Sequence, residues 1–188
     1  SAVTELVSAD GKVKTISRDV DGDGGADTQT ETAITVNADG TTTSTVNAKN
    51  GDGSLRNATT HTQSDDALTK TTTSDVDGDG DIDLTTVDQT VIHVDDSRTH
   101  TVTSTNNDGS INGMMKTTLA ADKVTSQTWV DLNQNGVFEA TDLLADVSVD
   151  PASGDRTSVS YGRNPDGSIN ATQTSVTSSD GLTTLTTI

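Results

Sequence analysis

The chain has 188 residues and a formal net charge of −18, and only 29% of its residues are hydrophobic and 2% aromatic. A globular domain is usually nearer half apolar, so this composition excludes a thick core and leaves either a thin, backbone-bonded structure or disorder. The acidity excludes nucleic acid as a partner, and the lack of cysteine excludes disulfides and thiolate metal sites.

In chain order, the first strand-like segment covers residues 3–7 and is followed by a turn at Asp10-Gly11. An acidic loop occupies residues 19–27, and residues 28–36 then alternate as a half-exposed strand does. Asn/Asp-Gly turns and Thr- and Val-rich segments continue to the last segment, residues 181–188. No window has a 3.6-residue apolar stripe, so the sequence predicts an all-β protein with almost no helix.

The acidic loops recur at a constant interval, starting at Asp19, Asp75 and Asp131 (75 − 19 = 131 − 75 = 56). Asn50-Gly51-Asp52-Gly53-Ser54 also recurs, at residues 106–110 and, after a short insertion, at 164–168. A fixed period with matching internal features indicates tandem repeats. We therefore predict a partial repeat at residues 1–18 and three repeats at residues 19–74, 75–130 and 131–188.

Each repeat carries four turn signals about 14 residues apart, which predicts an antiparallel up-and-down β meander. Turns of a meander alternate between two edges, so all three acidic loops fall on one edge, alternating with the turns at Asp52, Asp108 and Asp166. The pattern leaves open an elongated sheet, a solenoid or a fibre, with a closed barrel as the competing arrangement.

The first two loops have the spacing Asp-x-Asp-x-Asp-Gly-x-x-Asp, which places oxygen ligands as a calcium loop does. In loop one the expected ligands are Asp19, Asp21, Asp23 and Asp27, with the carbonyl of Gly25. In loop two they are Asp75, Asp77, Asp79 and Asp83, with the carbonyl of Asp81. Hard oxygens in this number suit Ca²⁺, and nothing here offers the nitrogen or sulfur that zinc prefers.

The third loop carries fewer early charges but has an acid at position 12. Its expected ligands are Asp131, Asn133, Asn135, Glu139 and Asp142, with the carbonyl of Val137. The alternative to calcium binding is three acidic surface turns without an ion. It is disfavoured because five carboxylates within nine residues of loop two repel one another without a cation. We expect three calcium ions and a chain that orders on binding them.

The loops resemble the calcium hairpins of integrin α-chain propellers, and the third also resembles a dockerin half-site. The whole pattern is similar to repeat arrays of very large secreted bacterial proteins, the repeats-in-toxin type of adhesin, although the Gly-Gly-x-Gly-x-Asp nonapeptide is absent. This resemblance implies secretion, extracellular calcium and a role at the cell surface or in the matrix.

The leading hypothesis is thus a calcium-rigidified structural repeat of an extracellular bacterial adhesin, matrix or filament protein. The alternatives are a glycan- or ice-binding module, using a Thr-rich face or Trp129, and an accessory module of a polysaccharide-modifying enzyme. The three histidines do not recur at equivalent repeat positions and the paired aspartates sit at turns, so we expect no catalysis. No apolar run approaches the length of a membrane span, so we expect no membrane insertion.

Both ends of the sequence interrupt the repeat, and the chain starts at Ser1 without Met. We therefore expect a fragment of a longer array. Residues 3–7 carry one charge and no proline, and residues 181–188 carry neither, so these edge strands lack the usual protection. We expect them to pair with neighbouring repeats or with identical copies.

Overall fold

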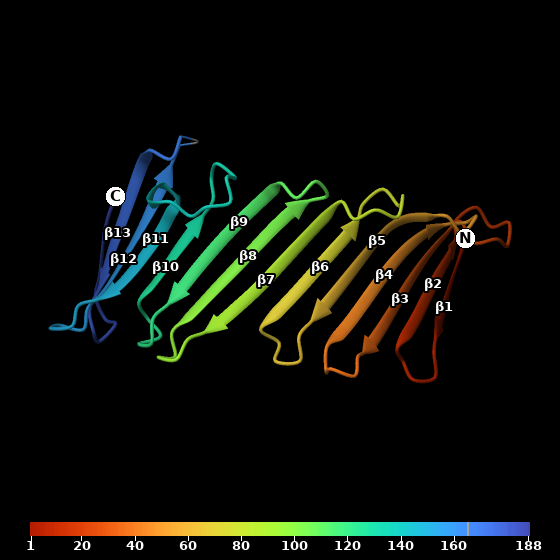
Figure 1. The fold of residues 1–188 in the computed structure, drawn as a ribbon, viewed down its shortest axis with the longest axis horizontal. Coiled ribbons are helices and arrows are strands. Elements are labelled where there is room, and N and C mark those ends of the chain that lie inside the picture. Colours follow the sequence, from red (N-terminus) through yellow and green to blue (C-terminus); the bar gives the residue numbers. More distant parts are fainter. Residues whose placement is uncertain (165) are drawn as a thin grey trace. The chain divides into compact units, whose positions relative to one another are not determined.

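The computed structural model describes residues 1–164 and 166–188, which form fourteen strands and one short 3-10 helix (Figure 1). The elements are β1 (Ala2–Val7), β2 (Val13–Asp19), β3 (Thr28–Val36), β4 (Thr42–Asn50), β5 (Leu55–Gln63), β6 (Thr69–Asp75), β7 (Leu84–Ile92), β8 (Arg98–Asn106), β9 (Ile111–Leu119), β10 (Ser126–Val130), η1 (Ala140–Asp142), β11 (Leu143–Val149), β12 (Arg156–Arg163), β13 (Ile169–Thr177) and β14 (Thr184–Thr187).

The strands follow one another in the sheet in sequence order, from β1 to β14, and neighbouring strands pair antiparallel. This confirms the predicted all-β up-and-down meander. β1 and β14 stand at opposite ends of the strand order, so the sheet is not closed into a barrel. No helix in the described part of the chain is long and apolar enough to cross a membrane.

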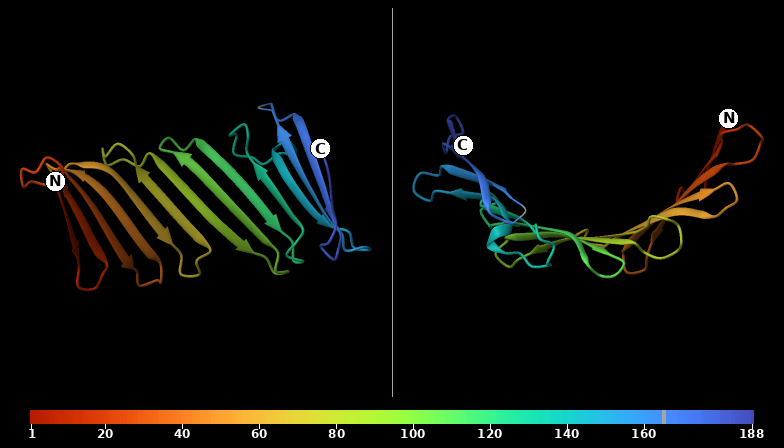
Figure 2. Two further views of the ribbon diagram at one scale, coloured as in Figure 1. Left: turned by 180° about the vertical axis from the view of Figure 1, so that it is seen from behind. Right: turned by 90° about the horizontal axis from the view of Figure 1, so that it is seen from above.

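The chain divides into two compact units, which we describe separately. The N-terminal unit contains Ser1–Asp88 and Ser104–Ser110, and the C-terminal unit contains Gln89–Thr103 and Ile111–Ile188. In each unit the strands form a single layer, and no described segment forms a second layer over either face (Figure 2).

A single-layer sheet needs no thick hydrophobic core, which explains how a sequence with so few apolar residues folds. Ala48 and Val147 are the only buried hydrophobic residues among those described, so no packed core exists to stabilise the sheet. Long, unbroken ladders replace it, such as the β3–β4 register from Thr28↔Asn50 to Val36↔Thr42. Threonine suits this arrangement because its branched carbon favours a strand and its hydroxyl bonds across strands, as Thr177 does to Thr184 at 3.2 Å.

Strand positions recur along the chain at the interval of the acidic loops. β3, β4 and β5 begin at residues 28, 42 and 55, and β7, β8 and β9 begin 56 residues later, at 84, 98 and 111. The boundaries of the three repeats stay a prediction, because the compact units divide the chain elsewhere.

The acidic loops share an edge with particular turns in each unit. In the N-terminal unit, loops one and two follow β2 and β6, and the Asp52 and Asp108 turns follow β4 and β8. In the C-terminal unit, loop three follows β10 and the Asp166 turn follows β12. Because strands alternate in direction, all even-numbered strands of one unit end at the same edge.

Candidate metal centres

Loop one, between β2 and β3, brings three carboxylates together. Asp19, Asp21 and Asp27 each place one oxygen within 4.8 Å of the others. Asp19 is the last residue of β2 and Asp27 directly precedes β3, so the strand ladder fixes both ends of the group. The amide of Asp27 donates to the carbonyl of Arg18 at 2.8 Å and extends that ladder into the loop.

Backbone amides of loop one point at these carboxylates. Asp19 accepts hydrogen bonds from the amides of Gly22 at 2.5 Å and Gly24 at 3.2 Å. Asp27 accepts one from the amide of Val20 at 2.6 Å. Each carboxylate oxygen has two lone pairs, so these bonds orient the acids and still leave acceptor capacity for a cation.

Loop two, between β6 and β7, repeats the arrangement. Asp75, Asp77 and Asp83 form a second group within 4.8 Å. Asp75 accepts from the amides of Gly78 at 2.6 Å and Gly80 at 3.0 Å, and Asp83 accepts from the amide of Val76 at 2.7 Å. Two loops 56 residues apart therefore use the same backbone donors for the same acids.

Glycine permits the turn of each loop. In loop two, Gly78 and Gly80 have φ values of 81° and 97°, where a side chain is strained. Gly78 is also restricted by space, because a Cβ there would lie 2.5 Å from the carbonyl oxygen of Leu55. Gly80 is the glycine at position 6 that the calcium-loop pattern predicts. Gly78 is at position 4, and its contact with Leu55 was not visible in the sequence.

The other predicted ligands of these loops lie beside the three-acid groups. Asp23 accepts from the amide of Gly25 at 2.7 Å, and Asp79 accepts from the amide of Asp81 at 2.9 Å. Neither Asp23 nor Asp79 belongs to the groups within 4.8 Å. A cation at either group therefore has three carboxylates in place, and the position-5 acid and the position-7 carbonyl stay predicted ligands.

Loop three closes differently. Asp131 accepts from the amides of Asn135 at 3.2 Å and Gly136 at 2.8 Å, as the first acid does in the other loops. The amide of Leu132, however, donates to Asp142 at 3.4 Å rather than to Glu139. Asp142, at position 12, thus takes the structural place that Asp27 and Asp83 hold at position 9.

Two of the three acids of loop three are buried, and all three have hydrogen-bonding groups near them. Asp131 and Asp142 are 3% and 1% exposed, and the amide of Glu139 donates to Asp142 at 2.9 Å. The side-chain amides of Asn133 and Asn135 each lie 3.4 Å from a Glu139 carboxylate oxygen, within hydrogen-bonding distance. Among the described residues, loop three contains no group of three acids like those of loops one and two.

Arg163 holds the end of loop three, a role that no motif in the sequence indicated. Its guanidinium donates to three backbone carbonyls: Leu143 at 2.9 Å, Gly167 at 2.7 Å and Ala140 at 3.2 Å. These bonds join β12 to the following turn, to η1 and to the first residue of β11. A single arginine near a turn is no specific signal, since its three partners are backbone atoms spread over 28 positions from 140 to 167.

Lys116 connects loop three to the sheet. Its ammonium lies 4.2 Å from the ring centre of Trp129 on β10 and 4.7 Å from that of Phe138 in the loop. The lysine thus places a cation against both aromatic rings. One face of Trp129 is thereby occupied by the lysine, and sugar stacking on this ring stays a prediction.

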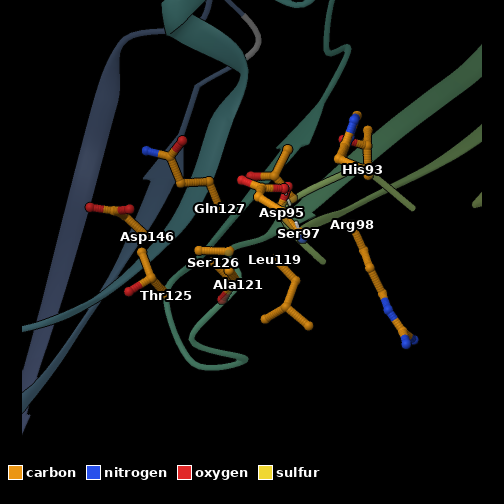
Figure 3. A pocket seen from close by; sticks show the side chains of 13 residues that line it. His93, Asp95, Ser97, Arg98, Leu119, Ala121, Thr125, Ser126, Gln127 and Asp146 are labelled. Carbon is orange, nitrogen blue, oxygen red and sulfur yellow. Dashed lines mark hydrogen bonds between the residues drawn. The ribbon is translucent and has the colours of Figure 1, made fainter. Parts of the chain in front are cut away.

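A cavity of about 490 Å³ lies elsewhere in the C-terminal unit (Figure 3). It opens between the β7–β8 and β9–β10 turns, and Lys123 joins these turns by donating to the carbonyl of Asp96. Its lining includes His93, Asp95, Gln127 and Asp146, while the Arg98 side chain extends away from the others (Figure 3). It contains none of the predicted metal ligands.

Comparison with known proteins adds no assignment: no protein-family model matches the chain, and no curated protein matches it.

Proposed function

We propose that this chain is a calcium-rigidified structural segment of an extracellular bacterial adhesin, matrix or filament protein, and not an enzyme. The observation that carries the proposal is the pair of three-carboxylate groups in loops one and two. They recur 56 residues apart with the same strand attachment and the same backbone donors. The Asp52 and Asp108 turns also recur with the same donors, but loops one and two differ from them in bringing three carboxylates together in each copy.

Electrostatics favours a cation at each group. Unit charges about 4 Å apart repel by about 1 kcal/mol in water and about 4 kcal/mol near a protein surface. Three carboxylates within 4.8 Å therefore oppose the closed loop unless a positive charge lies among them. The donor set fits Ca²⁺, since every group is a hard oxygen.

The chain's own residues determine what binding achieves mechanically. Asp19 ends β2 and Asp27 directly precedes β3, and Asp75 and Asp83 hold the same places at β6 and β7. The backbone amides of each loop orient these carboxylates, and a divalent ion bound among them would supply the positive charge that favours keeping the strand ends together. Because the sheet has almost no buried apolar residue, stiff loops are an effective way to order it.

The location follows from affinity and from the resemblance of the repeats. Calcium modules that work outside the cell need Kd values of only about 10⁻⁴–10⁻³ M, which suits a site with few protein ligands. The similarity to repeats-in-toxin adhesin arrays supports secretion to the bacterial surface. The partners we propose are calcium and, through the sheet edges, neighbouring repeats or identical copies.

Isothermal titration of the whole chain with CaCl₂ tests the proposal. We expect at least two binding events, one of which disappears in each of the variants Asp21→Ala and Asp77→Ala. Asp88→Ala removes an acidic residue outside the loops. This variant is the control and should bind calcium as the parent chain does. A chain that takes up no calcium at millimolar concentration would disprove the proposal.

A further inference from the structure

The turn between β4 and β5, residues 50–55, lies between loops one and two and touches both. All three segments belong to the N-terminal unit. On one side, a Cβ added to Gly51 would overlap the carbonyl oxygen of Ala26 and come within 3.2 Å of the Cα of Asp27. On the other side, Leu55 presents its carbonyl oxygen to Gly78 of loop two.

The turn itself is well bonded internally. The amide of Asn50 donates to the carbonyl of Ser54 and the amide of Gly53 to that of Asn50, both at 2.9 Å. Asp52 accepts from the amide of Ser54 at 2.9 Å and from its hydroxyl at 2.7 Å. A displacement at Gly51 is therefore passed on to Leu55 rather than absorbed within the turn.

Both contacts act directly on metal-binding groups. Asp27 is one of the three acids of loop one, and Gly51 lies against its Cα and the preceding peptide. Gly78 donates its amide to Asp75, one of the three acids of loop two. Order in either loop thus favours one position of the turn, and that position favours order in the other loop.

We propose that the β4–β5 turn couples the two loops, so that calcium at one loop raises the affinity of the other. The coupling rests on the proposed calcium function and adds to it a cooperative response in the N-terminal unit. Linkage requires it to be reciprocal, with the same factor in both directions. Gly51 is its positioning residue: its φ lies outside the left-handed region, so only the close approach to loop one requires glycine.

The next repeat provides a matched control. Asn107 occupies the place of Gly51 in the turn between β8 and β9, and it already carries a Cβ. An Asn107→Ala substitution should therefore leave the linkage between loops one and two unchanged. Gly51→Ala should abolish it, because the added carbon displaces the Ala26 carbonyl and Asp27 with it.

The experiment is a CaCl₂ titration of ¹⁵N-labelled full chain, followed through two backbone amides. Gly24 and Gly80 donate to Asp19 and Asp75, so each amide reports on its own loop. In Asp77→Ala the Gly80 response should vanish and the calcium midpoint at Gly24 should rise by about 5-fold or more. Asp21→Ala should raise the Gly80 midpoint by the same factor.

In the Gly51→Ala background, the Gly24 midpoint should be the same with or without Asp77→Ala. An unchanged Gly24 midpoint in Asp77→Ala alone would overturn the coupling while leaving the calcium function intact. Unequal shifts in the two directions would also overturn it, and this arm does not depend on how well Gly51→Ala folds. If neither amide responds to calcium in the parent chain, the proposed function itself fails.

Discussion

Loops one and two each bring three carboxylates together, whereas the end of loop three is held by hydrogen bonds and ring contacts from other side chains of the chain. In the first two, three acids lie within 4.8 Å and most of them are at least partly exposed. In the third, Asp131 and Asp142 are buried, Arg163 holds three carbonyls, and Lys116 lies near the ring of Phe138.

From this contrast we propose that one repeat position is ordered by two physical means. The mutual repulsion of three acids favours a cation at loops one and two, whereas arginine, amide and ring contacts partner the groups at the end of loop three, where calcium stays a prediction. If calcium binds as proposed, the N-terminal unit is the calcium-sensitive part of the chain, and the end of loop three keeps its structure when calcium is withdrawn.

Withdrawal of calcium is expected to have the largest effect. A ligand at 100 times its Kd stabilises the folded state by about 2.7 kcal/mol per site, so loops one and two should lose about this much each in chelator. Hydrogen exchange should then lose protection at the amides of Gly24 and Gly80 but not at Asp142. Equal loss of protection in all three loops would contradict the distinction drawn between them.

Replacement of Arg163 is expected to have the second-largest effect on stability. Arg163→Ala removes three charge-assisted bonds and leaves the carbonyls of Ala140, Leu143 and Gly167 without this donor. We expect the free energy of unfolding to fall by about 2–4 kcal/mol in urea denaturation, with or without calcium. Arg163→Lys should recover only part, because one ammonium does not reproduce the planar fork.

The exposed Arg98 serves as the control, since its side chain extends away from the residues around it (Figure 3). Arg98→Ala should change the free energy of unfolding by about 0.5 kcal/mol or less. If Arg163→Ala were equally mild, the arginine would not be what orders loop three.

The sequence predicted the meander because Asn/Asp-Gly turns and alternating threonines are local features, read within a few residues. It also predicted the loops whose acids meet, since their spacing fixes the order of oxygens along the chain. It did not show that Asp142 rather than Glu139 takes the place of Asp27, because the insertion of η1 changes the path of the chain. Contacts such as Arg163 with Leu143 join residues 20 positions apart, and no local pattern encodes them.

A smaller effect is expected at Lys116, which joins loop three to β10 through two rings. Lys116→Ala should lower the free energy of unfolding by about 0.5–2 kcal/mol and shift the emission of Trp129, the only tryptophan. Lys70→Ala on β6 is the control, because Lys70 is exposed and should leave that emission unchanged. Emission that is insensitive to Lys116→Ala would show that the lysine does not lie against the ring in solution.

The smallest effect is expected at the Asp52 turn, which shares an edge with loops one and two. This turn holds its carboxylate through hydrogen bonds of its own. The Ser54 hydroxyl donates to Asp52 at 2.7 Å and, with the Ser54 amide, lowers the pKa of that carboxyl. A depressed pKa contributes stability above the unfolded value of about 3.9, and this stability is lost as the pH falls through the folded pKa. Ser54→Ala removes the larger of the two causes, so the pKa of Asp52 should rise toward its ordinary value.

A carboxyl-detected NMR titration measures that rise directly, and Asp166, whose pKa is lowered by Ser168, provides the internal control because its turn is untouched. The shift should be the same in calcium and in chelator, since both partners of Asp52 lie within its own turn. A calcium-dependent pKa at Asp52 would mean that this turn, too, responds to the state of the adjacent loops. That result would extend the coupling through Gly51 and Leu55 to the carboxylate at the centre of the turn.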